Sequence, residues 1–210
     1  MQLHYLSSPP KKSTTEKSPA IILLHGRGSD EQDLFSLSPY LDERLHIYSI
    51  QAPYKFEFSG YTWFDLNMDG SIEIKRFEKS YLLLKECIDE IRNLPAIDSN
   101  KIFLLGFSMG AMMSYMLALT QPEKFSGVIA HSGFVPEQLP LHYQWNASKS
   151  PSFFITHGID DPVIPISFAR NTKKLFEKSS IDFLYKEYSM GHQINEECLA
   201  DAMQWLKNKI

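Results

Sequence analysis

The sequence contains 210 residues, a length that supports one domain with a sizeable hydrophobic core. Lys and Arg number 21 and Asp and Glu 25, so the formal charge is -4, which argues against a nucleic-acid partner. Residues 1–17 contain no apolar core of about seven residues, the mark of a signal peptide. No run in the sequence approaches the roughly 18 apolar residues of a membrane span. We therefore expect a single cytoplasmic domain over residues 1–210, with no stable membrane insertion.

The N-terminal segment, residues 1–19, is polar and rich in Pro, Ser and Lys, and its short apolar piece at 3–6 can form an edge strand. Residues 20–24 are a continuous apolar run, as in a parallel strand covered on both faces. This predicted strand ends at a glycine-flanked loop, His25-Gly26-Arg27-Gly28.

Residues 45–50 form the next predicted strand, and residues 51–71 lack the periodicity of a helix or a strand. We expect 51–71 to be a loop. It carries six aromatic rings: Tyr54, Phe56, Phe58, Tyr61, Trp63 and Phe64. From Phe77 to Ile91 apolar residues recur at spacings of three and four, which predicts a helix that ends before Pro95.

A predicted strand over 101–105 leads into Gly106-Phe107-Ser108-Met109-Gly110, and a nearly all-apolar helical segment over 111–119 follows. Gly-x-Ser-x-Gly between a strand and a buried helix is the pattern of the α/β-hydrolase nucleophile elbow, in which the glycines give room and the serine hydroxyl is exposed. We therefore predict that Ser108 is a nucleophile. The alternative is an ordinary turn serine.

Three more predicted strands, 126–130, 152–156 and 182–188, alternate with predicted helices over 163–179 and 194–209. This alternation indicates a mostly parallel central sheet with helices on both faces. Only about 20 residues separate the first two of these strands, too few for a cap domain. We therefore expect an α/β-hydrolase fold without a cap.

In α/β-hydrolases the catalytic residues follow the chain order Ser, Asp or Glu, His. Beyond residue 161 the only histidine is His192, which we predict to be the base; a surface or helix-capping histidine is the alternative. Asp160 and Asp161 both follow the strand at 152–156, and the sequence alone leaves both open as the acid. Pro162 favours an extended, projecting backbone at Asp161, and the other aspartate would cap the next helix.

An oxyanion hole needs two preorganised N–H donors. The elbow supplies the backbone N–H of Met109. We assign the second donor to the backbone N–H of Arg27, because the glycines on either side give that loop the required freedom. We expect no metal and no cofactor, since Cys87 and Cys198 lack neighbouring metal ligands and are predicted to be free thiols.

From about residue 20 onward the sequence resembles the carboxylesterase, lysophospholipase and acyl-protein thioesterase family of small serine hydrolases. The resemblance lies in HGRG at 25–28, WFD at 63–65, LLGFSMGA at 104–111, FSGV at 125–128, SGFVP at 132–136, HG at 157–158, DPV at 161–163 and GH at 191–192. It implies that Ser108, Asp161 and His192 take the triad positions, which selects Asp161 over Asp160. Many acyl-protein thioesterases carry glutamine in place of Met109, and this departure weakens the prediction of a protein depalmitoylase.

We predict a serine carboxylesterase that hydrolyses short to medium acyl esters of small molecules through an acyl-enzyme. Trp63, Phe64 and Phe134 are the predicted substrate-binding residues, with core packing of these rings as the alternative. An acyl-protein thioesterase or a lysophospholipase would use the same machinery. A ligand-binding receptor on a hydrolase scaffold is the alternative outside the enzymes, and the complete Ser, Asp, His and Gly set argues against it. The oligomeric state stays open, with a homodimer among the options.

Overall fold

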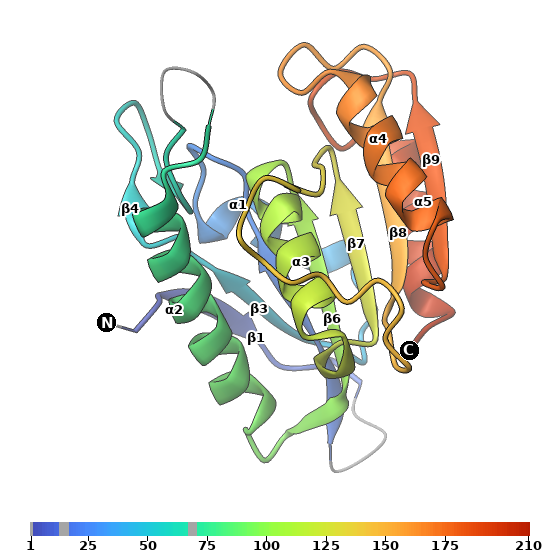
Figure 1. The fold of residues 1–210 in the computed structure, drawn as a ribbon. Helices are drawn as coiled ribbons and strands as arrows, with labels where there is room; N and C mark the ends of the chain where they lie inside the picture. Colours follow the sequence, from blue (N-terminus) through green and yellow to red (C-terminus); the bar gives the residue numbers. More distant parts are fainter. Residues whose placement is uncertain (1, 13–16, 67–70) are drawn as a thin grey trace.

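The computed structural model describes residues 2–12, 17–66 and 71–210, and a seven-stranded sheet lies at its centre (Figure 1). Across the sheet the strands lie in the order β1 (Tyr5–Ser8), β3 (His46–Ile50), β2 (Ser18–Leu24), β6 (Ile97–Phe107), β7 (Gly127–His131), β8 (Ser152–Gly158) and β9 (Phe183–Tyr188). β1 pairs with β3 antiparallel at one edge, and the remaining neighbours pair in parallel. The predicted mostly parallel sheet is confirmed.

Helices cover both faces of this sheet. α2 (Ile74–Arg92), α3 (Met109–Thr120) and α4 (Ile166–Glu177) pack on one face, and α1 (Glu31–Phe35) and α5 (Glu196–Lys207) pack on the other (Figure 1). Because successive strand residues point to opposite faces, Ile22 and Leu104 join the core under α2, α3 and α4, whereas Ile21 and Leu105 join the core under α1 and α5. This two-sided burial explains the continuous apolar runs of the strands.

α3 is buried along almost its whole length, from Met109 to Leu119. The sheet lies on one side of it, and the chain after β7 crosses its outer side (Figure 1), where the Gln144 N–H donates to the Leu119 carbonyl over 2.8 Å. All of residues 132–151 are described, and none of them lies in a helix or a strand. This segment therefore covers α3 and builds no cap domain.

Several predicted elements differ from the structure, among them the strand predicted at 101–105, since β6 begins at Ile97. α4 begins at Ile166 rather than at 163, because the Asp161 carboxylate accepts the N–H groups of Val163 and Ile164 and folds residues 161–164 into a turn. The predicted loop 51–71 contains a hairpin of β4 (Tyr54–Lys55) and β5 (Tyr61–Thr62). Residues 67–70 of that loop lie outside the described residues. Short 3-10 helices at Ser38–Tyr40 and Pro122–Lys124 complete the regular elements.

The direction of strand addition reverses between β2 and β6. From β2 the chain adds β3 on one side, and from β6 it adds β7, β8 and β9 in turn on the other. The loops that leave the carboxyl ends of β2 and β6 diverge there, which is where open α/β sheets bind their ligands. None of the helices in the described ranges is long and apolar enough to cross a lipid bilayer.

An ion pair joins α4 to the edge strand β9. The Arg170 guanidinium donates two hydrogen bonds of 2.8 Å to the Glu187 carboxylate, and the Tyr185 hydroxyl donates a third, also of 2.8 Å. The bonds from Arg170, aided by Tyr185, outweigh burial and lower the pKa of Glu187 from 4.5 to about 2.

We predict that Glu187→Gln lowers the free energy of unfolding at neutral pH, and that this difference shrinks in acid. Because the folded pKa is about 2 and the ordinary value is 4.5, the stabilisation is complete above pH 4.5 and is lost as the pH falls toward 2. Urea unfolding at stepped pH from about 7 to 3 measures the difference. Glu177→Gln, at the exposed pair with Lys173 on α4, is the control. An effect of Glu187→Gln that does not change with pH would contradict the prediction.

Candidate active site

Ser108 lies at the sharp turn between β6 and α3, with backbone angles φ 54° and ψ −117°. A positive φ is strained for any residue other than glycine and costs about 1–3 kcal/mol. The strain is maintained because the Ser108 N–H donates to the His131 carbonyl over 2.9 Å while its carbonyl accepts the Met112 N–H at 3.1 Å. The predicted elbow is therefore present, and it fixes the serine backbone from two sides.

The two glycines of the motif permit the close backbone contacts at this turn. A Cβ atom on Gly106 would lie 2.4 Å from the carbonyl oxygen of Gly110, and one on Gly110 would lie 1.9 Å from the carbonyl oxygen of Leu24. Neither contact allows a side chain. Gly110 thus lets the amino end of α3 touch the end of β2, which places Ser108 beside the loop 25–28.

His192 lies between β9 and α5 and reaches both other residues of the predicted triad. Its Nε2 lies 2.9 Å from Ser108 Oγ, and its Nδ1 lies 2.6 Å from Asp161 Oδ2. Because a carboxylate only accepts, Nδ1 carries the proton, and Nε2 is free to accept the serine hydroxyl. The ring also packs against Phe107, with centroids 5.0 Å apart, so contacts on several sides set its orientation.

Asp161 is 7% exposed and uses both carboxylate oxygens. Oδ1 accepts the N–H groups of Val163 and Ile164, each at 2.8 Å, and Oδ2 accepts His192. Burial alone would raise the pKa of Asp161, but the bonds from His192, Ile164 and Val163 lower it below its ordinary 3.8, so the group is ionised at neutral pH. Asp160 is exposed, and among the described residues no hydrogen bond or ion pair joins its side chain to His192. Asp161 thus orients His192 and also orders the turn at residues 161–164.

A second histidine, His157, also contacts the Asp161 carboxylate. His157, at the end of β8, is fully buried, and its Nε2 donates to the Ile164 carbonyl over 2.8 Å and lies 3.3 Å from Asp161 Oδ2. His157 belongs to the His-Gly motif at 157–158 that contributes to the family resemblance. Its contact with Asp161 was not predicted from the sequence. Its position four residues before Asp161, at the end of a parallel strand, is the signal that could have indicated it.

The backbone N–H groups of Arg27 and Met109 have no hydrogen-bond partner within the described part of the chain. A Cβ atom on Gly26 would lie 3.4 Å from Ser108 Cβ, so the Arg27 loop runs directly beside the serine. The Arg27 guanidinium lies over the Phe56 ring, 4.9 Å from its centroid. Two unpaired donors beside the serine hydroxyl match the requirement of an oxyanion hole.

His25 and Trp63 fix this loop from the core side. The buried His25 ring accepts the Ala52 N–H at Nε2 over 3.0 Å and donates from Nδ1 to the Gly26 carbonyl over 2.7 Å. Burial lowers the pKa of His25, consistent with a neutral ring that both donates and accepts. The Trp63 indole N–H donates to the His25 carbonyl over 2.9 Å.

The rings of Trp63 and Phe64 have no exposed surface. This corrects the prediction that they bind substrate: the β4–β5 hairpin turns both rings inward, and they join the core under α2, α3 and α4. Phe134, the third predicted substrate contact, is half-buried and packs against Phe168 with centroids 4.8 Å apart. The preceding residue, Gly133, packs against the Ser108 backbone: a Cβ atom there would lie 2.9 Å from the Ser108 carbonyl oxygen.

Residues 11–210 match the model of the family described as Phospholipase/Carboxylesterase. The chain belongs to the phospholipase/carboxylesterase family. It is 30% identical over 221 residues to "Acyl-protein thioesterase 1" of Candida albicans, with 95% of each chain covered, and 32% identical over 208 residues to that of Debaryomyces hansenii, with 89% of each covered. The crystal structure of esterase PE8 matches with a TM-score of 0.88 at 24% identity over 100% of both chains. That of the Bacillus cereus carboxylesterase matches with a TM-score of 0.84 at 23% identity over 99% of this chain and 95% of the other.

These matches confirm the predicted α/β-hydrolase fold. Membership of the family makes the chain a serine hydrolase that acts on ester or thioester bonds. Within the described residues, no group of three or more His, Cys, Asp or Glu side chains could hold a metal ion. Cys87 and Cys198 are both buried free thiols, as predicted, and burial raises the pKa of Cys198 to about 11.

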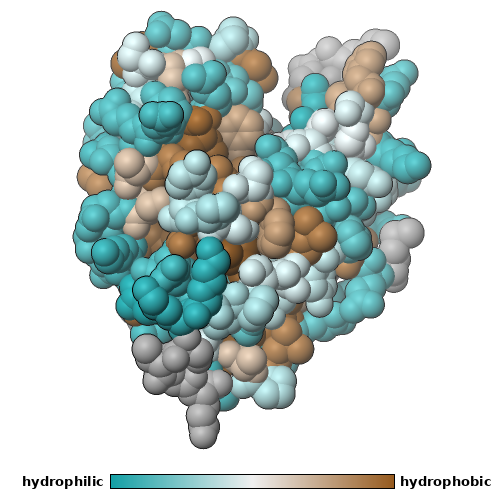
Figure 2. Space-filling view, turned by 180° about the vertical axis from the view of Figure 1, so that it is seen from behind, coloured by the Kyte–Doolittle hydropathy of each residue, from teal (hydrophilic) through white to brown (hydrophobic). Residues whose placement is uncertain are grey.

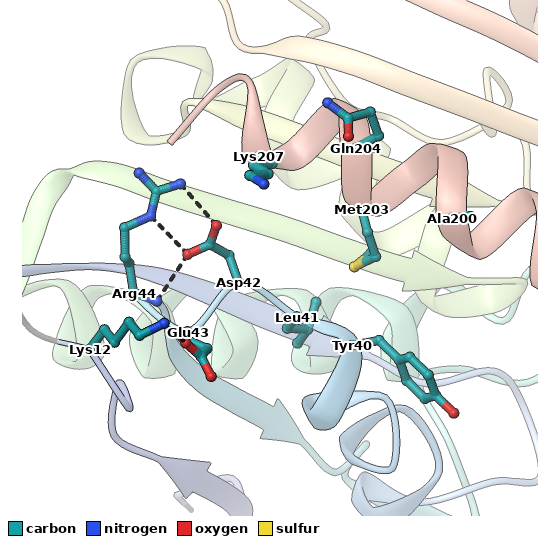
Figure 3. Close-up of a pocket in the computed structure, with 10 residues that line it drawn as sticks. All are labelled: Lys12, Tyr40, Leu41, Asp42, Glu43, Arg44, Ala200, Met203, Gln204 and Lys207. Carbon is teal, nitrogen blue, oxygen red and sulfur yellow. Dashed lines mark hydrogen bonds and ion pairs between the residues drawn. The ribbon is translucent and has the colours of Figure 1, made fainter.

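Two cavities of the protein lie at different distances from the candidate site. A groove of about 300 Å³ borders His192 directly. A larger one, of about 600 Å³, lies between residues 40–44 and α5, and its charged side chains largely pair with one another, as Arg44 does with Asp42 (Figure 3). Because residues 40–44 precede β3, this second cavity lies toward the amino ends of the strands, away from the site. Of these two cavities, the groove is the one that borders the candidate site.

We predict that Gly158→Ala lowers kcat by about 10²-fold, the loss that misplacement by about 1 Å can cause. A Cβ atom there would lie 2.3 Å from the carbonyl oxygens of both Met190 and Gly191, so the backbone that carries His192 must move. Gly191→Ala is the matched control, because its Cβ would meet nothing closer than Pro162 Cδ at 3.7 Å. Ester hydrolysis by the two folded variants is compared, and equal rates would show that the position of this backbone does not limit the reaction.

Proposed function

We propose that the protein is a serine carboxylesterase for small esters with short to medium acyl groups. The observation that carries this proposal is the continuous chain of contacts from Ser108 through His192 to Asp161, at 2.9 and 2.6 Å, beside two unpaired backbone N–H groups. A receptor would have no use for a strained serine held 2.9 Å from an imidazole that a carboxylate orients. The strain and the aligned contacts favour catalysis over binding alone.

In this mechanism His192 Nε2 takes the hydroxyl proton as Ser108 Oγ bonds to the ester carbonyl carbon. The oxyanion accepts hydrogen bonds from the N–H groups of Arg27 and Met109. His192 then gives its proton to the leaving alcohol oxygen as the carbon–oxygen bond breaks, which leaves an acyl-enzyme. His192 then takes a proton from water as the water oxygen bonds to the acyl carbon. The bond from that carbon to Ser108 Oγ breaks, His192 returns the proton to Ser108 Oγ, and the acid is released. Asp161 stays ionised throughout and stabilises the imidazolium.

The acyl group is proposed to lie over Phe134, whose ring packs against Phe168. Phe168 is 44% exposed, so the surface that it forms with Phe134 is open to solvent rather than enclosed. An open surface gains at most about 0.8 kcal/mol for each methylene it covers, and the gain stops where the rings end. This supports acyl chains of roughly four to ten carbons.

A thioesterase is the second candidate, because two relatives at 30% and 32% identity carry the name acyl-protein thioesterase 1. The machinery is common to esters and thioesters, so the leaving group and the acyl length decide between the two. Met109 stands in the position where many thioesterases of this type carry glutamine, and the acyl surface is short. Both features favour the carboxylesterase.

We predict that kcat/KM for p-nitrophenyl esters, from acetyl to palmitoyl, peaks at medium chain length, and that Ser108→Ala lowers it by at least about 10⁴-fold. Phe134→Ala should flatten the rise with chain length. Ser167→Ala, at an exposed serine of α4, is the control and should behave as the parent does. Fastest turnover of palmitoyl thioesters would favour the thioesterase, and activity that survives Ser108→Ala would refute both candidates.

A further inference from the structure

A groove of about 300 Å³ runs between α1 and the loop that carries His192. Its lining combines apolar side chains with polar ones: Leu34, Leu37, Phe107 and Ile194 with Asp33, Ser36, His192 and Gln193. Leu37, Phe107 and Ile194 are half-buried and lie on the core under α1 and α5. Figure 2 views the face that carries α1 and α5, and hydrophobic surface gathers there in a hollow in its upper half.

We propose that this groove binds the leaving group of the ester, and that this leaving group is an uncharged alkyl or aryl alcohol. The inference rests on the proposed function and names the part of the substrate that the groove selects.

The position of the general acid assigns the groove to the leaving group. The acyl carbon is bonded to Ser108 Oγ, and its carbonyl oxygen faces the N–H groups of Arg27 and Met109. Of the remaining substituents, the leaving oxygen must lie within about 2.6–3.2 Å of His192 Nε2 to receive its proton. The groove is lined by the His192 ring and by Phe107, which packs against that ring at 5.0 Å. Phe134 and Phe168, proposed to contact the acyl group, are absent from the described lining.

Size and charge define the class of alcohol. A volume of about 300 Å³ is at the lower end for small-molecule sites, so the groove suits a compact group. Its described lining holds one carboxylate, Asp33, which accepts the Ser29 hydroxyl at 2.9 Å, and includes no Lys or Arg. A leaving group that carries a phosphate or a carboxylate would meet this negative charge without a compensating cation. The lining therefore favours apolar, uncharged alcohols over phosphate-bearing head groups.

The first test uses acetate esters of primary alcohols from ethanol to hexanol, in which the acyl group is constant. We expect kcat/KM to rise about two- to fourfold per methylene until the groove is filled. Leu37→Ala should reduce this slope, and Leu82→Ala, at an exposed leucine of α2, should leave it as in the parent. If Leu37→Ala does not fold, Ile194→Val measures the same slope.

The second test compares 4-acetoxybenzoate with phenyl acetate, whose leaving groups differ by a carboxylate. Asp33→Asn removes the negative charge from the lining, and we expect it to raise kcat/KM for the anionic ester several-fold relative to the neutral one. Glu57→Gln, at an exposed acid on the β4–β5 hairpin, is the control for net charge and should leave this ratio unchanged.

The outcomes separate the two claims. A flat alcohol series with Ser108-dependent hydrolysis, or slopes and ratios that the groove variants do not change, would overturn the assignment of the groove while the esterase stands. Absence of Ser108-dependent hydrolysis for every ester would instead refute the proposed function.

Discussion

The candidate site depends on one close approach, that of the amino end of α3 to the carboxyl end of β2. Gly110 allows it, since any Cβ there would lie 1.9 Å from the Leu24 carbonyl oxygen. The approach places the strained Ser108 beside the loop 25–28, so that the proposed nucleophile at the end of β6 lies next to the proposed N–H donor at the end of β2. Buried groups such as Trp63 and His25 then hold that loop in place. The fold thus fixes the distance between nucleophile and donor before any substrate binds, which is the preorganisation that electrostatic catalysis requires.

The other half of the site comes from the end of β8 and the chain after β9. There the Asp161 carboxylate accepts three hydrogen bonds, two from its own turn and one from His192, and the resulting lowered pKa keeps it charged. The absence of a side chain at Gly158 lets the backbone before His192 approach β8. The position of His192 therefore depends on the close contact between the backbone of residues 190–191 and Gly158. We propose that the surfaces beside this centre, the groove at His192 and the ring pair of Phe134 and Phe168, determine substrate preference.

Much of this arrangement could be predicted from the sequence, because its signals are local. The glycines around Ser108 and the apolar strand runs can each be recognised within a few residues. The order of serine, aspartate and histidine can be read directly along the chain. The burial of Trp63 and Phe64 could not be predicted, since it depends on a hairpin that turns the segment inward. The choice between Asp160 and Asp161 needed the family resemblance, because adjacent residues differ only in the direction of their side chains. The groove at His192 joins segments about 150 residues apart, and no local pattern marks it.

The most direct measurement of the central claim is a crystal structure of the protein after reaction with a small alkyl fluorophosphonate, which mimics the tetrahedral intermediate. The account predicts a phosphorus atom bonded to Ser108 Oγ, with the phosphoryl oxygen about 2.7–3.1 Å from the backbone nitrogens of both Arg27 and Met109. A phosphoryl oxygen turned away from these two nitrogens, or an adduct on a residue other than Ser108, would contradict it.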